Sequence, residues 1–198
     1  MPDRRAPSEV PATASGTAAN GGVVPGVAAP GAAVPARPSR GMAFWLFMAA
    51  LLVLLDQLTK LYFEHSYTYG QRVNLLPIFD FTLVYNPGAA FSFLAGQDGW
   101  QRWFFTALAL GVAGVIAWLL RRHASTQPRF CLALTLILGG AVGNAIDRVA
   151  HGHVIDFLLF YWNNWYFPAF NIADVAITCG AILLVLDELL RGRKAAAA

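Results

Sequence analysis

The chain has 198 residues, of which 57% are hydrophobic and only 13% are charged, and its mean hydropathy is +0.52. Soluble domains usually carry about 25% charged residues, so the composition indicates a membrane protein and excludes an ordinary soluble domain. The net charge of +3 would suit a nucleic-acid partner, but the basic residues form short clusters between apolar runs. We therefore interpret them as topology signals and expect no nucleic-acid partner.

Residues 1–40 are rich in Ala, Pro, Gly, Ser and Thr and show no apolar periodicity. Such a segment cannot bury enough apolar surface to fold, so we expect a disordered tail. It has no apolar core before a cleavage site and therefore does not look like a secretory signal peptide. The first membrane span follows at about 42–63, which is long enough to cross a hydrocarbon layer of about 30 Å.

The segment after the first span has a mixed character. Residues 78–85 combine β-branched and aromatic side chains with partial alternation, which predicts a strand. Residues 86–88 (Asn-Pro-Gly) predict a turn, and residues 89–94 are compatible with a returning strand. We expect a small sheet lying on the membrane surface.

Three further apolar runs predict spans at about 103–120, 130–146 and 170–190. The segment 149–169 between the last two runs is rich in Phe, Tyr and Trp, like the aromatic belts found at headgroup level. Cys131 and Cys179 lie inside predicted spans, where we interpret them as small packing residues rather than as a disulfide framework.

The basic residues predict the orientation. With the N-terminus inside, ten of the 14 Lys and Arg residues lie on the cytoplasmic side. The asymmetry favours four spans with both termini cytoplasmic. The expected domains are a tail at 1–40, a four-helix membrane domain at 41–191 and a short cytoplasmic tail at 192–198.

Polar side chains interrupt the apolar runs at three places, and the predicted topology brings all three to one depth near the outer surface. They are Asp56 and Lys60 late in the first run, Asn144, Asp147 and Arg148 at the end of the third, and Asn171 and Asp174 at the start of the fourth. A charge at mid-membrane costs roughly 2.5–3.5 kcal/mol on insertion scales. Their convergence therefore indicates a functional site.

The acidic residues differ in their surroundings. Asp147 has two candidate counter-charges, its neighbour Arg148 and the distant Lys60, so a structural role as a salt-bridged anchor competes with a catalytic one. Asp156 and Asp174 have no basic residue within four positions on a helical face. Two such acids at a membrane interface suggest a carboxylate dyad that shares one proton, with one acid as general base and the other as general acid.

Two further patterns bear on the site. Gly139 and Gly143 have the spacing that lets helices approach closely, and we expect them to bring the third and fourth spans together. A zinc cluster of Asp147, His151, His153 and Asp156 is a weaker alternative, because both histidines are expected in a wet loop. We expect neither a metal nor another cofactor.

Five motifs, in order, resemble those of the bacterial lipoprotein signal peptidase (signal peptidase II) family. They are residues 56–60 (DQLTK), 86–92 (NPGAAFS), 143–148 (GNAIDR), 154–157 (VIDF) and 167–174 (FPAFNIAD). The similarity covers about residues 42–190. Pro87 follows the motif asparagine at a position that varies in the family, and the N-terminal tail lies outside the resemblance.

The resemblance implies an intramembrane aspartic endopeptidase of the bacterial cytoplasmic membrane, which removes signal peptides from diacylglyceryl-modified prolipoproteins just before the lipidated cysteine. It also implies a β-sheet cradle at the outer surface and sensitivity to globomycin-type cyclic peptides. By motif, the roles are Asp156 and Asp174 as catalytic dyad, Asn86, Asn144, Arg148 and Asn171 as residues that line or order the site, and Asp56 and Lys60 as a supporting pair. Asp147 is a rival candidate for the dyad.

The expected fold is thus an all-α membrane protein of four transmembrane helices with a small β-sheet cradle. Two other functions fit the same spans. A small four-helix transporter would also carry carboxylates, but nearer mid-membrane and with repeats or broken helices. A non-catalytic scaffold would not need unpaired acids.

Overall fold

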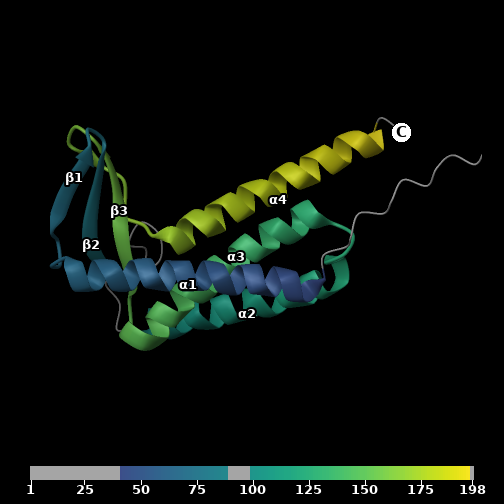
Figure 1. Cartoon of the computed structure of the whole chain (residues 1–198), viewed down its shortest axis with the longest axis horizontal. Helices are drawn as coiled ribbons and strands as arrows, with labels where there is room; N and C mark the ends of the chain where they lie inside the picture. The colour runs from purple at the N-terminus through teal and green to yellow at the C-terminus, as the bar shows by residue number, and fades with distance from the viewer. Residues whose placement is uncertain (1–40, 89–98, 197–198) are drawn as a thin grey trace, which may run out of the picture. The chain divides into compact units, whose positions relative to one another are not determined.

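The computed structural model describes residues 41–88 and 99–196. The expected tail at 1–40 and the expected strand at 89–94 lie outside the described residues. Four long helices and four strands follow one another along the chain (Figure 1). They are α1 (Met42–Ser66), β1 (Arg72–Leu76), β2 (Phe79–Asn86), α2 (Trp100–His123), α3 (Pro128–His151), β3 (Val154–Trp162), β4 (Trp165–Tyr166) and α4 (Ile172–Ala196).

Three helices in the described part of the chain, α1, α2 and α3, are long and apolar enough to cross a membrane. They contain the first three predicted spans. Helix α4 has the same length as α1, but each 18-residue stretch of it contains more than two charged residues, since Asp187 and Glu188 near its end are joined by Asp174, by Arg191 or by both. A fourth membrane span therefore stays a prediction.

Helix α3 is the most buried of the helices that qualify as spans, and it contacts α1, α2 and α4. Its glycines allow these contacts, though not as the spacing suggested. A Cβ atom at Gly140 would collide with the carbonyl oxygen of Ala173 on α4, whereas one at Gly139 would meet Leu52 of α1 at 2.7 Å. The prediction that Gly139 and Gly143 join the third and fourth helices is therefore wrong for Gly139.

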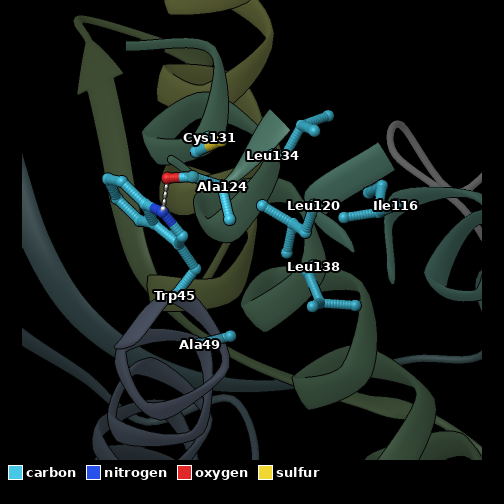
Figure 2. Packing of buried hydrophobic residues seen from close by; sticks show 8 residues of the cluster. All are labelled: Trp45, Ala49, Ile116, Leu120, Ala124, Cys131, Leu134 and Leu138. Atoms are coloured by element: carbon cyan, nitrogen blue, oxygen red, sulfur yellow. Dashed lines mark hydrogen bonds between the residues drawn. The ribbon is translucent and has the colours of Figure 1, made fainter. Parts of the chain in front are cut away.

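The end of the bundle away from the strands has its own apolar core (Figure 2). Trp45 of α1 reaches the turn between α2 and α3, where its indole Nε1 donates a hydrogen bond to the carbonyl oxygen of Ala124 at 3.1 Å. Apolar side chains of α1, α2 and α3 belong to the same buried cluster, namely Ala49, Ile116, Leu120, Cys131, Leu134 and Leu138. The helices are therefore fixed to one another at this end, independently of any polar site.

The strands form one antiparallel sheet in the order β1-β2-β3-β4, and Figure 1 shows the three labelled strands together at one end of the helices. Strand β2 corresponds to the predicted strand at 78–85. Its neighbours are β1 and β3, so the sheet is built partly from the segment 149–169 that we interpreted only as an aromatic belt. The alternation of apolar and polar residues that marks a strand is not visible in this run, because both faces of β3 carry large apolar side chains.

Packed rings and one polar cluster hold the sheet in place. Phe63 of α1 stacks on Phe157 of β3 with ring centroids 4.3 Å apart. On the sheet itself, the buried Asp80 accepts hydrogen bonds from Arg72 and Asn74, both at 2.9 Å. Burial alone would raise the pKa of Asp80, but these hydrogen bonds lower it below its ordinary value. The ionised carboxylate therefore ties β1 to β2.

Substitution of Gly140 by Ala is expected to separate α3 from α4 and to destabilise the fold. Forcing a methyl group into a packed contact costs about 1–3 kcal/mol. Gly111→Ala in α2 is the matched control, because outside the neighbouring part of its own helix no atom lies within 4 Å of its added Cβ. Thermal unfolding in detergent would test the pair, and equal midpoints for the two variants would contradict this packing.

Candidate active site

The three polar clusters meet around the side chain of Lys60, which is 1% exposed. Its ammonium nitrogen lies 2.8 Å from a carboxylate oxygen of Asp56 and 2.8 Å from one of Asp147. It also donates a hydrogen bond to Oδ1 of Asn144 at 2.9 Å. Asn144 in turn donates from Nδ2 to Oδ1 of Asp174 at 2.8 Å. Side chains from α1, α3 and α4 thus form one continuous network.

The start of α4 is a reciprocal cap that contains Asp174. The amide N–H of Asp174 donates to Oδ1 of Asn171 at 3.0 Å, and the N–H of Asn171 donates to Oδ2 of Asp174 at 3.3 Å. Such a box supplies acceptors for N–H groups that have no partner inside the helix. The segment before it pairs with β3, because Phe170 and Leu158 exchange backbone hydrogen bonds at 2.9 and 3.0 Å. This pairing fixes Asp174 beside β3.

Asp156 comes from β3 and is 1% exposed. Its two carboxylate oxygens accept hydrogen bonds from neutral amides, Oδ1 from Asn171 at 2.7 Å and Oδ2 from Asn86 at 3.1 Å. Burial, followed by the negative charge of Asp174, raises the pKa of Asp156 from 3.8 to about 7. Asp156 can therefore gain or lose a proton near neutral pH.

Asp147 is held by partners far away in the chain. Lys60 pairs with one of its oxygens, and the backbone N–H of Ile155 donates to that same oxygen at 3.2 Å. The guanidinium of Arg148 instead donates to the carbonyl oxygens of Gly88 at 3.0 Å and Asn144 at 3.2 Å. Of the two counter-charges left open by the sequence, Lys60 is the one that Asp147 uses.

Gln57 belongs to the network, although we assigned it no role from the sequence. Its amide Nε2 donates to Asp147 at 2.8 Å and to the carbonyl oxygen of Gly143 at 3.2 Å. The available signal was its position beside Asp56 and three residues before Lys60 in an otherwise apolar run. Gln57 thus gives Asp147 a second side-chain partner from α1.

A cavity of about 470 Å³ opens beside Asp174, within the usual size range of ligand sites. Its polar lining includes Asn86, Asn144, Arg148 and Asp174, and the apolar lining comes mostly from α4 and the segment before it. Cys179 also lines this cavity and is exposed, whereas Cys131 is buried. The interpretation of both cysteines as packing residues is therefore wrong for Cys179, which faces the cavity because it lies one helical turn after Val175, another residue of the lining.

The zinc alternative finds no support in the geometry. Within residues 41–88 and 99–196, no three His, Cys, Asp or Glu side chains are grouped so as to hold a metal ion. The carboxylate of Asp147 is occupied by Lys60, and His153 packs its ring against Tyr85 at 4.3 Å. Asp147 and Asp156 therefore face different partners.

The chain is similar to known proteins over this entire region. A family profile described as signal peptidase (SPase) II matches residues 48–190. A lipoprotein signal peptidase of Cupriavidus taiwanensis is 58% identical over 150 residues, covering 76% of this chain and 85% of the relative. One from Paraburkholderia phymatum is 55% identical over 161 residues, covering 81% and 96%.

Solved structures agree with these sequence relatives. A bacterial membrane enzyme determined by the in meso method at 2.3 Å resolution has a TM-score of 0.68 and 29% identity, covering 76% of this chain and 90% of the other. A second such structure, at 1.9 Å, has a TM-score of 0.66 and covers 96% of the other chain. The fold is therefore shared with solved bacterial membrane enzymes.

The chain belongs to the signal peptidase II family, and it is an aspartic protease of that type. The resemblance in the five motifs is thereby confirmed. Membership of a peptidase family decides against the transporter and scaffold alternatives.

The raised pKa of Asp156 predicts how stability depends on pH. The unfolded carboxyl ionises near 3.8 and the folded one near 7, so its favourable contribution is complete below about pH 4 and is lost as pH rises to about 7. The thermal midpoint of the wild type should therefore fall more between pH 5 and pH 8 than that of Asp156→Asn, which has no proton to lose. Each kcal/mol corresponds to roughly 2–4 °C in a domain of this size.

Asp80→Asn is the control of opposite sign. The pKa of Asp80 is lowered in the folded protein, so this variant should lose stability at pH 8 and approach the wild type as pH falls. Parallel pH curves for wild type and Asp156→Asn would contradict the raised pKa.

Proposed function

We propose that the protein cleaves the signal peptide from diacylglyceryl-modified prolipoproteins, just before the lipidated cysteine, with Asp156 and Asp174 as its catalytic dyad. One observation carries the assignment of the dyad. Asn171 contacts both carboxylates at once, through its side chain at Asp156 and through its backbone N–H at Asp174. Asp147, the rival candidate, is instead held in an ion pair by the ammonium group of Lys60, 2.8 Å away.

The two acids have different environments, which suggests how they divide the chemistry. Asp174 accepts N–H hydrogen bonds at the N-terminus of α4, where the helix dipole favours a negative charge. Asp156 is almost fully buried on a strand, with a pKa of about 7. We assign the shared proton to Asp156 and the negative charge to Asp174 before the reaction begins.

The reaction then follows from this arrangement. Asp174 takes a proton from a water molecule as the water oxygen bonds to the scissile carbonyl carbon, while Asp156 gives its proton to the carbonyl oxygen. In the second step, Asp174 gives its proton to the amide nitrogen as the carbon–nitrogen bond breaks. Asp156 recovers a proton from one hydroxyl of the intermediate, so the dyad ends as it began.

The cavity suits a lipid-modified substrate. Its apolar lining, including Phe167, Val175 and Ile177, can cover hydrocarbon, while Asp174 lies at its polar side. A water-filled cleft would have to extract a buried chain at a cost of about 0.8 kcal/mol per CH₂ group. We expect cyclic peptides of the globomycin type to compete with substrate for this cavity.

The orientation in the bacterial inner membrane is part of the proposal. Arg121 and Arg122 lie at the α2–α3 turn, at the opposite end of those helices from Asp147, and Arg191 lies near the end of α4. Basic residues favour the cytoplasmic side, so we expect both termini there, α4 as the fourth span, and the sheet and dyad near the outer face. A reporter domain that works only in the cytoplasm should be active when fused to either terminus, and one that works only in the periplasm should be inactive. Activity of a periplasmic reporter at the C-terminus would contradict α4 as a membrane span.

Asp156→Asn and Asp174→Asn should each lower cleavage of a purified lipidated precursor by at least about 10⁴-fold, because an amide cannot exchange the catalytic proton. Asp147→Asn should lose less turnover and more thermal stability, since it breaks the pair with Lys60. Single-turnover rates and unfolding midpoints should be measured on the same samples. Activity in Asp156→Asn, together with a stable but inactive Asp147→Asn, would transfer the catalytic role to Asp147.

A further inference from the structure

Asn144 connects the buried ammonium of Lys60 with the carboxylate of Asp174. The ammonium group has three N–H donors and no acceptor. These donors meet Asp56 at 2.8 Å, Asp147 at 2.8 Å and Oδ1 of Asn144 at 2.9 Å. Asn144 is the uncharged one of these three partners, and it alone contacts a member of the proposed dyad.

The direction of the Asn144 amide follows from its neighbours. An ammonium group can face only the oxygen end of an amide, because the nitrogen end also carries hydrogens. Oδ1 also accepts a hydrogen bond from Nδ2 of Asn171 at 3.2 Å. Because Oδ1 of Asn144 faces Lys60 and Asn171, its Nδ2 faces Asp174 and donates a hydrogen bond to it at 2.8 Å.

We propose that Lys60 is a positioning residue for peptide-bond cleavage, because it fixes the Asn144 amide so that an N–H group rather than an oxygen faces Asp174. The inference rests on the proposed role of Asp174. Turning the amide over would place Oδ1 against the carboxylate, and the repulsion between two acceptors would favour a protonated Asp174. A protonated Asp174 cannot accept a proton from water.

The position of Lys60 separates this role from substrate binding. The cavity beside Asp174 is lined by Asn144 but not, among the described residues, by Lys60. Lys60 instead lines a separate hollow of about 180 Å³, together with Glu64 and His151. Removal of its hydrogen bond to Asn144 should therefore lower kcat and leave KM nearly unchanged.

The charged groups around Asn144 decide how to design the test. Lys60 and Asp56 approach from α1, Asp147 and Arg148 from α3, and Asp174 from α4, with Asp156 beyond Asn171 on β3. Removing Lys60 alone would leave Asp56 and Asp147 without a counter-charge. Combining a neutral substitution of Lys60 with Asp147→Asn removes one charge of each sign, so the net charge of this cluster stays the same.

The decisive pair is Lys60→Gln and Lys60→Met, both in the Asp147→Asn background. The two introduced side chains have similar length and no charge, but only the Gln amide can donate an N–H hydrogen bond to Oδ1 of Asn144. We expect the Lys60→Gln variant to cleave a purified lipidated precursor about tenfold faster in kcat than the Lys60→Met variant, with KM values agreeing within about twofold. A thermal unfolding midpoint well above the assay temperature shows that a variant is folded during the assay.

A matched substitution separates the hydrogen bond from general loosening of α1. Thr59→Val removes side-chain hydrogen bonds to the carbonyl oxygens of Leu55 and Asp56 within α1 but none with Asn144, so in the same Asp147→Asn background it should keep the kcat of that parent. Equal kcat values for the Lys60→Gln and Lys60→Met variants would overturn the proposal. Failure of only the Lys60→Met variant to fold would also overturn it, because the hydrogen bond would then be a requirement of folding. Cleavage by the wild type in the same assay shows that neither result reflects failure of the proposed function.

Discussion

Close backbone contact between α3 and the helices on either side is the constraint on which the polar site depends. At Gly140 the first turn of α4 lies so near that no Cβ atom fits, and at Gly143 an added Cβ would lie 2.5 Å from Oδ2 of Asp56. Asp56 can therefore reach past α3 and accept a hydrogen bond from the backbone N–H of Ala173 on α4 at 2.9 Å. Short polar side chains meet across three helices only because the helices are this close.

The network uses two kinds of hydrogen-bond donor for its carboxylates. Asp56 and Asp147 each lie 2.8 Å from the ammonium of Lys60 and form ion pairs with it. The side-chain donors to Asp156 and Asp174 are neutral amides. An amide orients a carboxylate without opposing its protonation as strongly as a cation does. The four acids of the network thereby separate into two that pair with a cation and two whose side-chain donors are neutral amides.

Much of this organisation was visible in the sequence. Charged residues in apolar runs predicted three clusters at one depth, and the contacts among Lys60, Asn144 and Asp174 bring them together. Details that depend on tertiary packing were not predictable. The partner of Asp147 is 87 positions away rather than its neighbour Arg148, because successive helical residues point about 100° apart. The same rotation made Gly140, not Gly139, the contact with α4.

Asp156 lies on a strand, so its position is fixed by backbone pairing with neighbouring segments, which a purely helical site would lack. Backbone hydrogen bonds position this residue from both sides, since β3 pairs Asp156 with Val84 of β2 and pairs Leu158 with Phe170 just before α4. The β2–β3 register is irregular between Phe81 and Val84, and bulges of this kind commonly re-aim a side chain next to a site. One strand therefore determines the distance from Asp156 to Asn86 and to Asn171 together. The geometry of the two acids depends on a backbone ladder, while the surrounding helices supply their charges and their partners.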